Sequence, residues 1–389
     1  MKNFDVIILG CGAAGAMCAI SSKVKSLAVI DVATRPAKKL LVTGNGRCNL
    51  TNTNVNSSFY NTNIDRYLKR FDNKQTLRFF NSLGLETYAD DEGRVYPISN
   101  SAKSVVDVIS QKLNDENLFL GQKIVSVRKE KEFFVVETDK EVFKAKILVV
   151  TTGGNSFSLL GNLGVKYAKF IPSLVSLKAK NTRELNGIKL SDVKVTATNK
   201  FGSVIEIGEV LFKEEGLSGI VIFNISTLFA RNNDFSGSVS IDLLPKLGKK
   251  EIFERLIERK KLDVFGDKFF VGMFQNAVAN EIFKQAKINT NKNVKEFSDQ
   301  EIDGMVDAIK NLHFEVFGCY ENNQVFSGGV RLDDLTENLE SKQIKNLFFC
   351  GEIVNVDGVC GGYNLQWAWT SGHIVGESLW LRLNKYLFQ

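Results

Sequence analysis

Phe4-Asp5-Val6-Ile7-Ile8-Leu9-Gly10-Cys11-Gly12-Ala13-Ala14-Gly15 is the stretch that decides the fold, because an apolar run passes directly into a glycine-rich turn. Residues 4–9 are typical of a strand that is buried on both faces in a parallel sheet. Residues 13–24 carry many small side chains and predict a helix packed on that sheet. Residues 27–31 predict a second apolar strand, which ends in an acid. This order of strand, turn, helix and strand predicts a Rossmann-like dinucleotide-binding fold.

The glycines and the acid of this unit have separate physical roles. Gly10 permits the tight turn, Gly12 lets the backbone approach a pyrophosphate, and Gly15 lets the helix pack closely on the strand. The first helical turn, which includes Ala14, offers free N–H groups and a partial positive charge to phosphates. Asp31 is placed to accept hydrogen bonds from the hydroxyls of an adenosine ribose. The pattern alone does not distinguish FAD from NAD.

A later segment favours FAD. Residues 122–150 predict three successive strands joined by charged turns, and they lead into Thr151-Thr152-Gly153-Gly154. Such a meander, ending in a turn of small residues, resembles the segment with which FAD-dependent oxidoreductases return to the dinucleotide site. An ordinary β-turn would also explain these last residues.

The end of the chain gives stronger support for FAD. Residues 346–350 predict another buried strand, and Gly351-Glu352 follows it. An acid at this point could bind a ribityl hydroxyl. Residues 358–369 then turn into a helix with an apolar stripe, and glycines such as Gly362 expose the N-terminus of that helix. In flavoproteins, the dipole of such a helix stabilises the negative charge that reduction places on the pyrimidine edge of the flavin.

The chain resembles the BaiN/YhiN-type bacterial flavoproteins, which are described as NAD(P)/FAD-dependent or aminoacetone oxidase-like oxidoreductases. Residues 39–52, 93–100, 216–219 and 351–372 carry the resemblance. It implies that FAD is bound, that the loop from Gly44 to Asn52 lies along the cofactor, and that an insert interrupts the FAD domain. The chain departs from the family in two places. Lys213-Glu214-Glu215 stands where members usually have a Thr-His pair, and Asn45 stands where a third glycine is frequent.

We expect four catalytic or hydrogen-bonding roles. Arg47 would bind an anion or a carbonyl, Asn49 and Asn364 would contact the flavin or the substrate, and Tyr363 would donate a proton. For each of these residues the alternative is that it only braces a loop or caps the helix. The expected catalytic residues are Arg47, Asn49 and Tyr363. The expected FAD-binding residues are Gly10, Gly12, Ala14, Gly15, Asp31, Lys39, Gly44, Gly46, Arg47, Cys48, Asn49, Thr152, Gly153, Gly351, Glu352, Gly362, Asn364 and Leu365.

The predicted fold class is α/β: a Rossmann-like FAD-binding domain of the glutathione reductase type, with a single dinucleotide fold and an inserted domain. Residues 1–185 and 315–389 would form the FAD domain. The insert, residues 186–314, would comprise a β-rich part to about 246, including residues 220–225 as a strand, and a helical part to 314. No catalytic constellation is evident in the insert, so we assign it to covering the flavin and shaping a substrate cleft.

Composition limits the alternatives. The chain has 389 residues, 44% hydrophobic and 24% charged, and a net charge of +6 whose Lys and Arg residues are scattered, so nucleic acid is only a minor alternative as a partner. The six cysteines form no C-x-x-C pair, and His313 and His373 are the only histidines, so we expect neither a metal site nor disulfides. No apolar stretch is long enough to span a membrane, and we expect a cytoplasmic protein.

These observations predict an FAD-dependent oxidoreductase that transfers electrons between NADH or NADPH and a small organic substrate through flavin N5. The acceptor implied by the resemblance is an enone or a similar polarised double bond. Because only one G-x-G-x-x-G is present, the nicotinamide would be a transient co-substrate without a domain of its own. An RNA-modifying flavoenzyme and a redox-sensing flavoprotein without fast turnover are the alternatives. The choice of nicotinamide and the oligomeric state stay open.

Overall fold

The computed structural model describes residues 1–155, 157–321 and 324–384, and the chain divides into two compact units. Unit 1 comprises Met1–Ile171 and Val325–Gln389, and unit 2 comprises Pro172–Gln324. Unit 2 is wider than the insert expected at 186–314, because strand β11 and the end of strand β16 complete its sheet.

Unit 1 is built on a seven-stranded sheet with the order β6-β2-β1-β9-β8-β7, and β18 also pairs with β9. The strands are β1 (Lys2–Leu9), β2 (Leu27–Asp31), β6 (Leu118–Leu120), β7 (Ile124–Glu130), β8 (Phe133–Thr138), β9 (Val142–Val150) and β18 (Leu347–Phe349). β1 runs parallel to β2 and β9, and β18 runs parallel to β9. Their carboxyl ends therefore meet at one edge of the sheet, where α/β proteins bind ligands.

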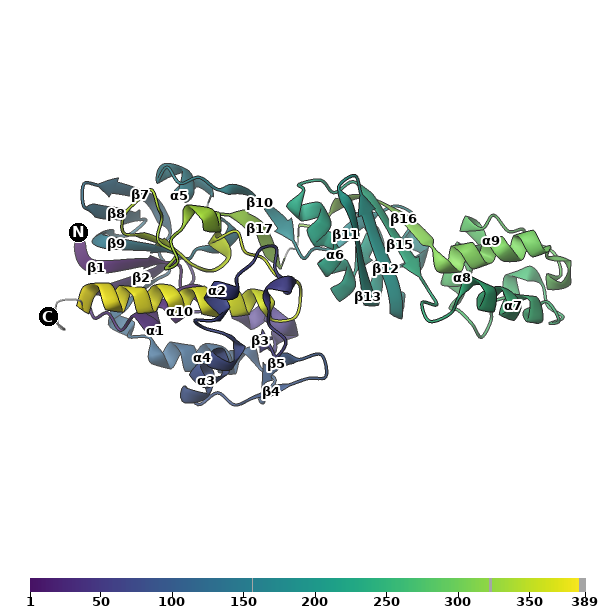
Figure 1. The fold of residues 1–389 in the computed structure, drawn as a ribbon, viewed down its shortest axis with the longest axis horizontal. Coiled ribbons are helices and arrows are strands. Elements are labelled where there is room, and N and C mark those ends of the chain that lie inside the picture. The colour runs from purple at the N-terminus through teal and green to yellow at the C-terminus, as the bar shows by residue number, and fades with distance from the viewer. Residues whose placement is uncertain (156, 322–323, 385–389) are drawn as a thin grey trace. The chain divides into compact units, whose positions relative to one another are not determined.

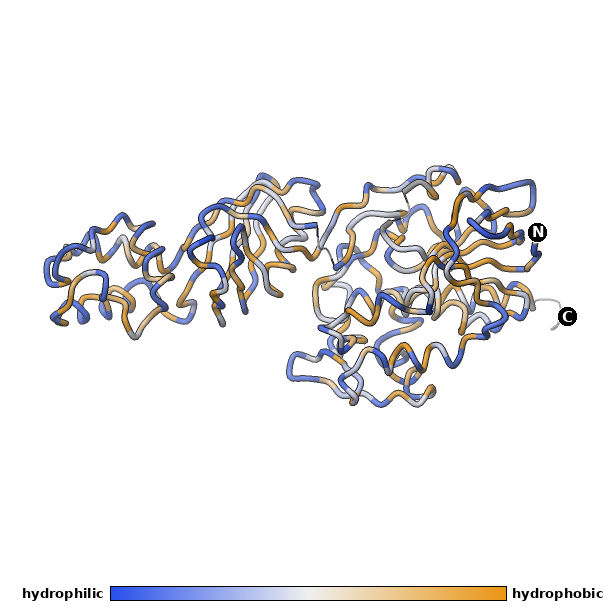
Figure 2. The backbone as a smooth tube through the Cα atoms, turned by 180° about the vertical axis from the view of Figure 1, so that it is seen from behind, coloured by the Kyte–Doolittle hydropathy of each residue, from blue (hydrophilic) through white to orange (hydrophobic). Residues whose placement is uncertain are grey.

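Two helices lie against each other beside this sheet, as Figure 1 shows: α1 (Ala13–Ser22) and α10 (Tyr363–Asn384). Glycines on α10 allow the close approach. A Cβ on Gly372 would lie 2.5 Å from the carbonyl oxygen of Ala14, and a Cβ on Gly376 would lie 2.7 Å from that of Cys18. The central strands are buried on both faces and largely hydrophobic, in orange in Figure 2, as the sequence predicted for a parallel sheet.

The rest of unit 1 consists of two smaller sheets and short helices. A small sheet has the order β3-β5-β4, and β10 pairs with β17 in a two-stranded sheet. These elements are η1 (Lys38–Gly46), β3 (Thr51–Asn52), η2 (Ser57–Phe59), α2 (Asp65–Leu68), α3 (Asn73–Ser82), β4 (Thr87–Ala89), β5 (Arg94–Pro97), α4 (Ala102–Lys112), η3 (Asp115–Asn117), η4 (Gly153–Asn155), α5 (Phe157–Asn162), β10 (Ala168–Ser173), β17 (Val325–Gly329), η8 (Leu332–Asp334) and η9 (Gly351–Ile353).

Unit 2 contains a closed barrel with the order β11-β14-β13-β12-β15-β16, and the helices at residues 249–310 lie in the chain between β15 and β16. Alternate residues of its strands are buried inside, which confirms the β-rich part of the insert. Its elements are β11 (Leu177–Ala179), η5 (Arg183–Leu185), β12 (Lys189–Asn199), β13 (Gly202–Lys213), β14 (Gly216–Ser218), α6 (Ile220–Arg231), β15 (Gly237–Asp242), α7 (Lys249–Arg259), η6 (Gly266–Lys268), α8 (Asn276–Gln285), η7 (Val294–Glu296), α9 (Asp299–Lys310) and β16 (Leu312–Cys319).

The strand predicted at residues 220–225 is wrong, because these residues form the first half of helix α6. A short apolar run cannot be assigned to a strand or a helix by periodicity alone. The structure resolves the ambiguity in two ways. Gly219 has φ +107, which turns the chain out of β14, and the buried residues Ile222, Ile225 and Phe229 recur at helical spacing against the barrel.

All six cysteines are free thiols, and Cys11, Cys18, Cys48 and Cys350 are buried. Within the part of the chain that the structure describes, no three His, Cys, Asp or Glu side chains gather in a way that could hold a metal ion. Over the same residues, no helix combines the length and apolarity needed to cross a bilayer.

Candidate cofactor and active site

The turn between β1 and α1 presents open backbone at the carboxyl edge of the sheet. Gly12 is the N-cap of α1, and no side chain caps the helix there. A Cβ on Gly12 would meet nothing within 4 Å, whereas a Cβ on Gly15 would lie 2.0 Å from the carbonyl oxygen of Gly10. Gly15 is thus required by packing, and Gly12 leaves space over free N–H groups. A pyrophosphate fits such a helix N-terminus.

A residue that the sequence did not single out holds this turn in place. The Thr151 hydroxyl, at the end of β9, donates hydrogen bonds of 2.9 Å to the carbonyl oxygen of Leu9 and 2.8 Å to that of Gly10. Its neighbour Thr152, which the sequence did nominate, follows directly. The local sequence of small residues gave no sign that the first threonine would be the one anchored to β1.

The acid at the end of β2 faces the same turn. Asp31 Oδ2 accepts a hydrogen bond of 2.5 Å from the backbone N–H of Cys11, and Oδ1 accepts one of 2.7 Å from that of Ala33. These bonds orient the carboxylate, and each oxygen keeps a lone pair for a further donor. A ribose hydroxyl is a donor of the required kind.

Residues from opposite ends of the chain meet beside the turn. The Lys39 ammonium lies 3.4 Å from Glu352 Oε2, and a Cβ on Gly153 would lie 3.0 Å from the same oxygen. The backbone N–H of Phe326 donates a 2.8 Å hydrogen bond to Glu352 Oε1. Because Lys39 is largely exposed, solvent screens this ion pair, and its main effect is to orient the acid.

Gly351, which precedes this acid, explains how the last strand comes so near to α1. It has φ +78, and a Cβ there would lie 2.7 Å from the Cβ of Ala14. Only glycine fits both the left-handed conformation and the space. Two nominated residues, one from each end of the chain, are therefore direct neighbours.

The loop that carries the family resemblance folds back sharply on itself. Gly44, Asn45, Gly46 and Cys48 all have φ between 54° and 80°. A Cβ on Gly44 would lie 2.8 Å from the backbone nitrogen of Asn49. Cys48 is fully buried, and this burial raises the pKa of its thiol to about 12. The thiol thus stays protonated at neutral pH and serves packing, which argues against thiolate chemistry in this loop.

Asn49 supplies the most direct sign of a ligand. Its side-chain Oδ1 is buried and accepts no hydrogen bond from any residue that the structure describes. Leaving such an acceptor unpaired costs about 1–3 kcal/mol. The isoalloxazine ring of a flavin carries an N–H group that could donate a hydrogen bond to this oxygen. The residues around the turn and the loop therefore fit FAD.

The N-terminus of α10 is positioned by contacts far away in the chain. Gly361 and Gly362 precede it with φ +127 and +98, and a Cβ on Gly362 would lie 2.5 Å from the carbonyl oxygen of Thr51. One turn into the helix, buried Gln366 Oε1 accepts hydrogen bonds from the hydroxyls of Thr51 (2.6 Å) and Thr76 (3.1 Å). Gln366 lies within residues 351–372, which carry the family resemblance, but no role was expected for it from the sequence.

Three nominated residues begin this helix. The Tyr363 ring stacks on Phe59 with centroids 4.4 Å apart, and burial raises the pKa of its hydroxyl. Asn364 exchanges two hydrogen bonds with the backbone of Gly358, of 2.9 and 2.8 Å, so its amide braces the preceding loop. Leu365 packs against the core of unit 1. In this conformation Asn364 is less available to a ligand than Asn49 is.

Arg47 is placed differently from Arg94, the arginine of the neighbouring β4–β5 hairpin. Its guanidinium stacks 4.3 Å above the Tyr96 ring, and it forms no ion pair within the described residues. Arg94, in contrast, is held by Asp90 at 2.8 Å and by Glu92 at 2.9 Å. Arg47, unlike Arg94, is therefore left free to bind an anion or a carbonyl oxygen.

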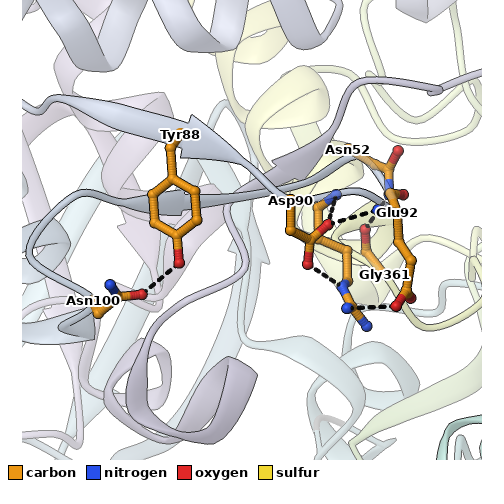
Figure 3. Close-up of polar contacts among 7 residues, drawn as sticks. Asn52, Tyr88, Asp90, Glu92, Asn100 and Gly361 are labelled. Atoms are coloured by element: carbon orange, nitrogen blue, oxygen red, sulfur yellow. Dashed lines mark hydrogen bonds and ion pairs between the residues drawn. The ribbon is translucent and has the colours of Figure 1, made fainter.

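The hairpin of β4 and β5 is tied to the start of α10, as Figure 3 shows. Asn52 Nδ2 donates to the carbonyl oxygens of Gly361 (3.1 Å) and Glu92 (3.3 Å). At the other end of the hairpin the Tyr88 hydroxyl donates a 2.6 Å hydrogen bond to Asn100 Oδ1. Asn52 thus joins three segments at the candidate site.

The fold and the site define a Rossmann dinucleotide-binding protein. The family described as "HI0933-like protein Rossmann domain" matches residues 4–378, and the chain belongs to this family. The family includes the BaiN/YhiN-type flavoproteins, so the resemblance inferred from the sequence is confirmed, and with it a flavoprotein oxidoreductase class.

Relatives match almost the whole chain. The 3-dehydro-bile acid delta(4,6)-reductase of Clostridium scindens is 30% identical over 95% of this chain and 98% of its own length. The ribosomal RNA dihydrouridine synthase of Escherichia coli is 26% identical over 97% of this chain and 98% of its own length. That of Haemophilus influenzae is 27% identical, over 96% and 98%.

Proposed function

We propose that the protein is an FAD-dependent oxidoreductase that takes electrons from NADH or NADPH and reduces a carbon–carbon double bond conjugated to a carbonyl group. One observation carries the choice of acceptor. The names of the relatives, a delta(4,6)-reductase of a 3-dehydro compound and a dihydrouridine synthase, both denote reduction of a double bond next to a carbonyl. The two substrates differ in size and polarity, so the shared bond is the best guide to the reaction.

The residues of unit 1 would hold FAD as follows. The open N-terminus of α1 at Gly12 would take the pyrophosphate, and Asp31 would take the adenosine ribose. Glu352 would bind a ribityl hydroxyl, while Asn49 and the N-terminus of α10 would face the pyrimidine edge. When bound, FAD supplies the two-electron carrier between the nicotinamide and the acceptor.

The chain's own side chains would then handle charge and protons. The unpaired guanidinium of Arg47 would bind the carbonyl oxygen of the acceptor and stabilise the negative charge that develops there. As hydride reaches the β carbon, the α carbon needs a proton, and Tyr363 would provide it. Because burial raises the Tyr363 pKa, the hydroxyl is protonated throughout the neutral range.

Uracil in RNA is a second candidate acceptor. Two relatives are named ribosomal RNA dihydrouridine synthases, and this chain carries a net charge of +6. The C5–C6 double bond of uracil is conjugated to a carbonyl, so the same residues would serve. The two candidates differ only in the molecule that contains the double bond: a small organic compound in the first, and a base of RNA in the second.

Anaerobic stopped-flow absorbance of the FAD-loaded protein tests the proposal. We expect NADH or NADPH to bleach the visible flavin band, and an unsaturated ketone or a uridine-containing RNA to restore it. Flavin that stays oxidised with both nicotinamides would contradict the proposed electron donor. Flavin that is reduced but is not reoxidised by either acceptor would contradict the proposed substrate class.

Tyr363→Phe separates the two half-reactions. Reduction by the nicotinamide should be unchanged, while reoxidation by the acceptor should slow by about 10²–10⁴-fold if the hydroxyl donates the proton. Tyr88→Phe is the matched control, because the one partner of its hydroxyl among the described residues is Asn100, at the far end of the hairpin. Equal effects on both half-reactions would assign Tyr363 a structural role instead.

A further inference from the structure

Two lysines and two glycines form a row across four neighbouring strands of the unit 2 barrel. Lys213 in β13 pairs with Gly216 in β14, Gly216 pairs with Lys178 in β11, and Lys178 pairs with Gly318 in β16. Residues directly opposite each other in paired strands share a face of the sheet. The two lysines thus lie on one face, separated by a residue without a side chain.

This face is the outside of the barrel. The sequence neighbours Leu177 and Phe212 are 0% and 1% exposed and belong to the barrel core. Because side chains alternate along a strand, Lys178 and Lys213 point outward. Both lysines are nevertheless half-buried, since neighbouring structure covers their stems.

A tyrosine and a buried serine gather the two ammonium groups. The Nζ atoms of Lys213 and Lys178 lie 4.8 Å and 5.6 Å from the centroid of the Tyr320 ring. Lys213 Nζ also lies 3.1 Å from Ser176 Oγ, which in turn lies 2.9 Å from Ser218 Oγ. Both serines are buried, so this hydrogen bond holds the Lys213 ammonium group close to the wall of the barrel.

Among the residues that the structure describes, neither ammonium group forms an ion pair with a carboxylate oxygen within 4 Å. Other lysines on the same barrel are paired: Lys180 with Glu315 at 2.8 Å, and Lys200 with Asp234 at 2.9 Å. Two like charges that are partly removed from water and close to one ring repel each other. A bound anion would relieve this repulsion and use donors that are already oriented.

We propose that Lys178, Lys213 and Tyr320 form a binding site for a phosphate group. Gly216, which lies between the two lysines, adds no side chain to this face, and the two ammonium groups supply donors to one anion.

The proposed function suggests two sources for the phosphate group. The inference rests on the proposed function only for the identity of these two sources. One is a phosphodiester of an RNA substrate, and the other is the 2′-phosphate that distinguishes NADPH from NADH. Binding can be measured without turnover, so a failure of the proposed reaction would not be confused with a failure of this site.

The test uses the FAD-loaded full chain with Lys178→Gln and Lys213→Gln. Fluorescence anisotropy would follow binding of a labelled oligouridine RNA, and calorimetry would compare NADP⁺ with NAD⁺. Loss of one charged contact should weaken the phosphate ligand about tenfold. For RNA, each substitution should also lower the slope of log affinity against log salt by about 1. For NADP⁺, affinity should fall while NAD⁺ is unaffected.

Two controls complete the design. Lys213→Arg keeps the charge and should retain affinity, whereas Lys200→Gln removes an exposed, paired lysine and should change nothing. Weaker binding of RNA or of NADP⁺ in both glutamine variants supports the site and identifies the source of the phosphate. If both variants keep their melting temperature and bind all three ligands like the wild type, the inference is overturned.

Discussion

The two helices that begin at the candidate cofactor site, α1 and α10, reach it by different means. α1 follows β1 within a single local motif, in which Gly10 and Gly15 touch each other and Gly12 faces open space. α10 begins about 350 residues later, and its start is held by Thr51, Thr76 and Asn52 from the first hundred residues. The first helix start is therefore a local structure, and the second is a tertiary one.

This difference teaches where each kind of mutation should act. A change in the α1 turn should act either through the contact between Gly15 and the Gly10 carbonyl oxygen or by filling the open space at Gly12. A change at α10 should act through a buried network that also holds the loop containing Asn49. At α1, different substitutions should therefore change stability and flavin binding independently. At α10, one substitution should change both.

The largest effect is expected at the α1 turn. Gly15→Ala places a Cβ 2.0 Å from the Gly10 carbonyl oxygen and should cost about 3–5 kcal/mol of unfolding free energy, with loss of flavin. Gly12→Ala is the matched control, because its Cβ meets nothing within 4 Å. It should keep the melting temperature and weaken only FAD binding. A normal melting temperature for Gly15→Ala would refute the packing argument.

Gly362→Ala tests the start of α10. The Cβ would lie 2.5 Å from the Thr51 carbonyl oxygen, in a backbone with φ +98, so we expect a loss of about 2–3 kcal/mol. FAD affinity should fall with it, because the same shift moves the helix N-terminus. Urea unfolding and flavin fluorescence would measure the two effects. Gly161→Ala, with open space at its Cβ, should change neither.

Gln366→Leu removes the polar centre of the α10 network. The buried Thr51 hydroxyl would lose its acceptor, which should cost about 1–3 kcal/mol, whereas the Thr76 hydroxyl would keep the Asp72 carbonyl oxygen. Since the network positions α10, the flavin midpoint potential measured by dye equilibration should also shift. Destabilisation with an unchanged potential would show that α10 does not act on the flavin.

The smallest effect concerns alkaline pH. Burial raises the Cys48 pKa from 9.0 to about 12, so the unfolded thiol ionises first and the folded state loses relative stability as pH rises between these values. The full contribution is present below pH 9. Cys48→Ala should therefore show a shallower fall in unfolding free energy between pH 9 and 11 than the wild type. Parallel curves would exclude this linkage.

Much of unit 1 was predictable because its signals are local. β1, α1 and β2 follow from one apolar run, one glycine turn and one acid, and the meander β7–β9 and helix α10 follow from periodicity. The expected roles of Arg47, Asn49 and Tyr363 stay predictions. Among the described residues, Arg47 has no ion pair and Asn49 Oδ1 has no hydrogen-bond donor.

The sequence by itself determined the Rossmann core, since hydrophobic period and glycine placement act within a few residues of one another. Only the tertiary structure decided that residues 220–225 are helical, that Gln366 joins β3 to α10, and that Lys178 and Lys213 share one face of a barrel. These features depend on contacts between distant segments. Their energies come from packing and buried hydrogen bonds that no local pattern of residues records.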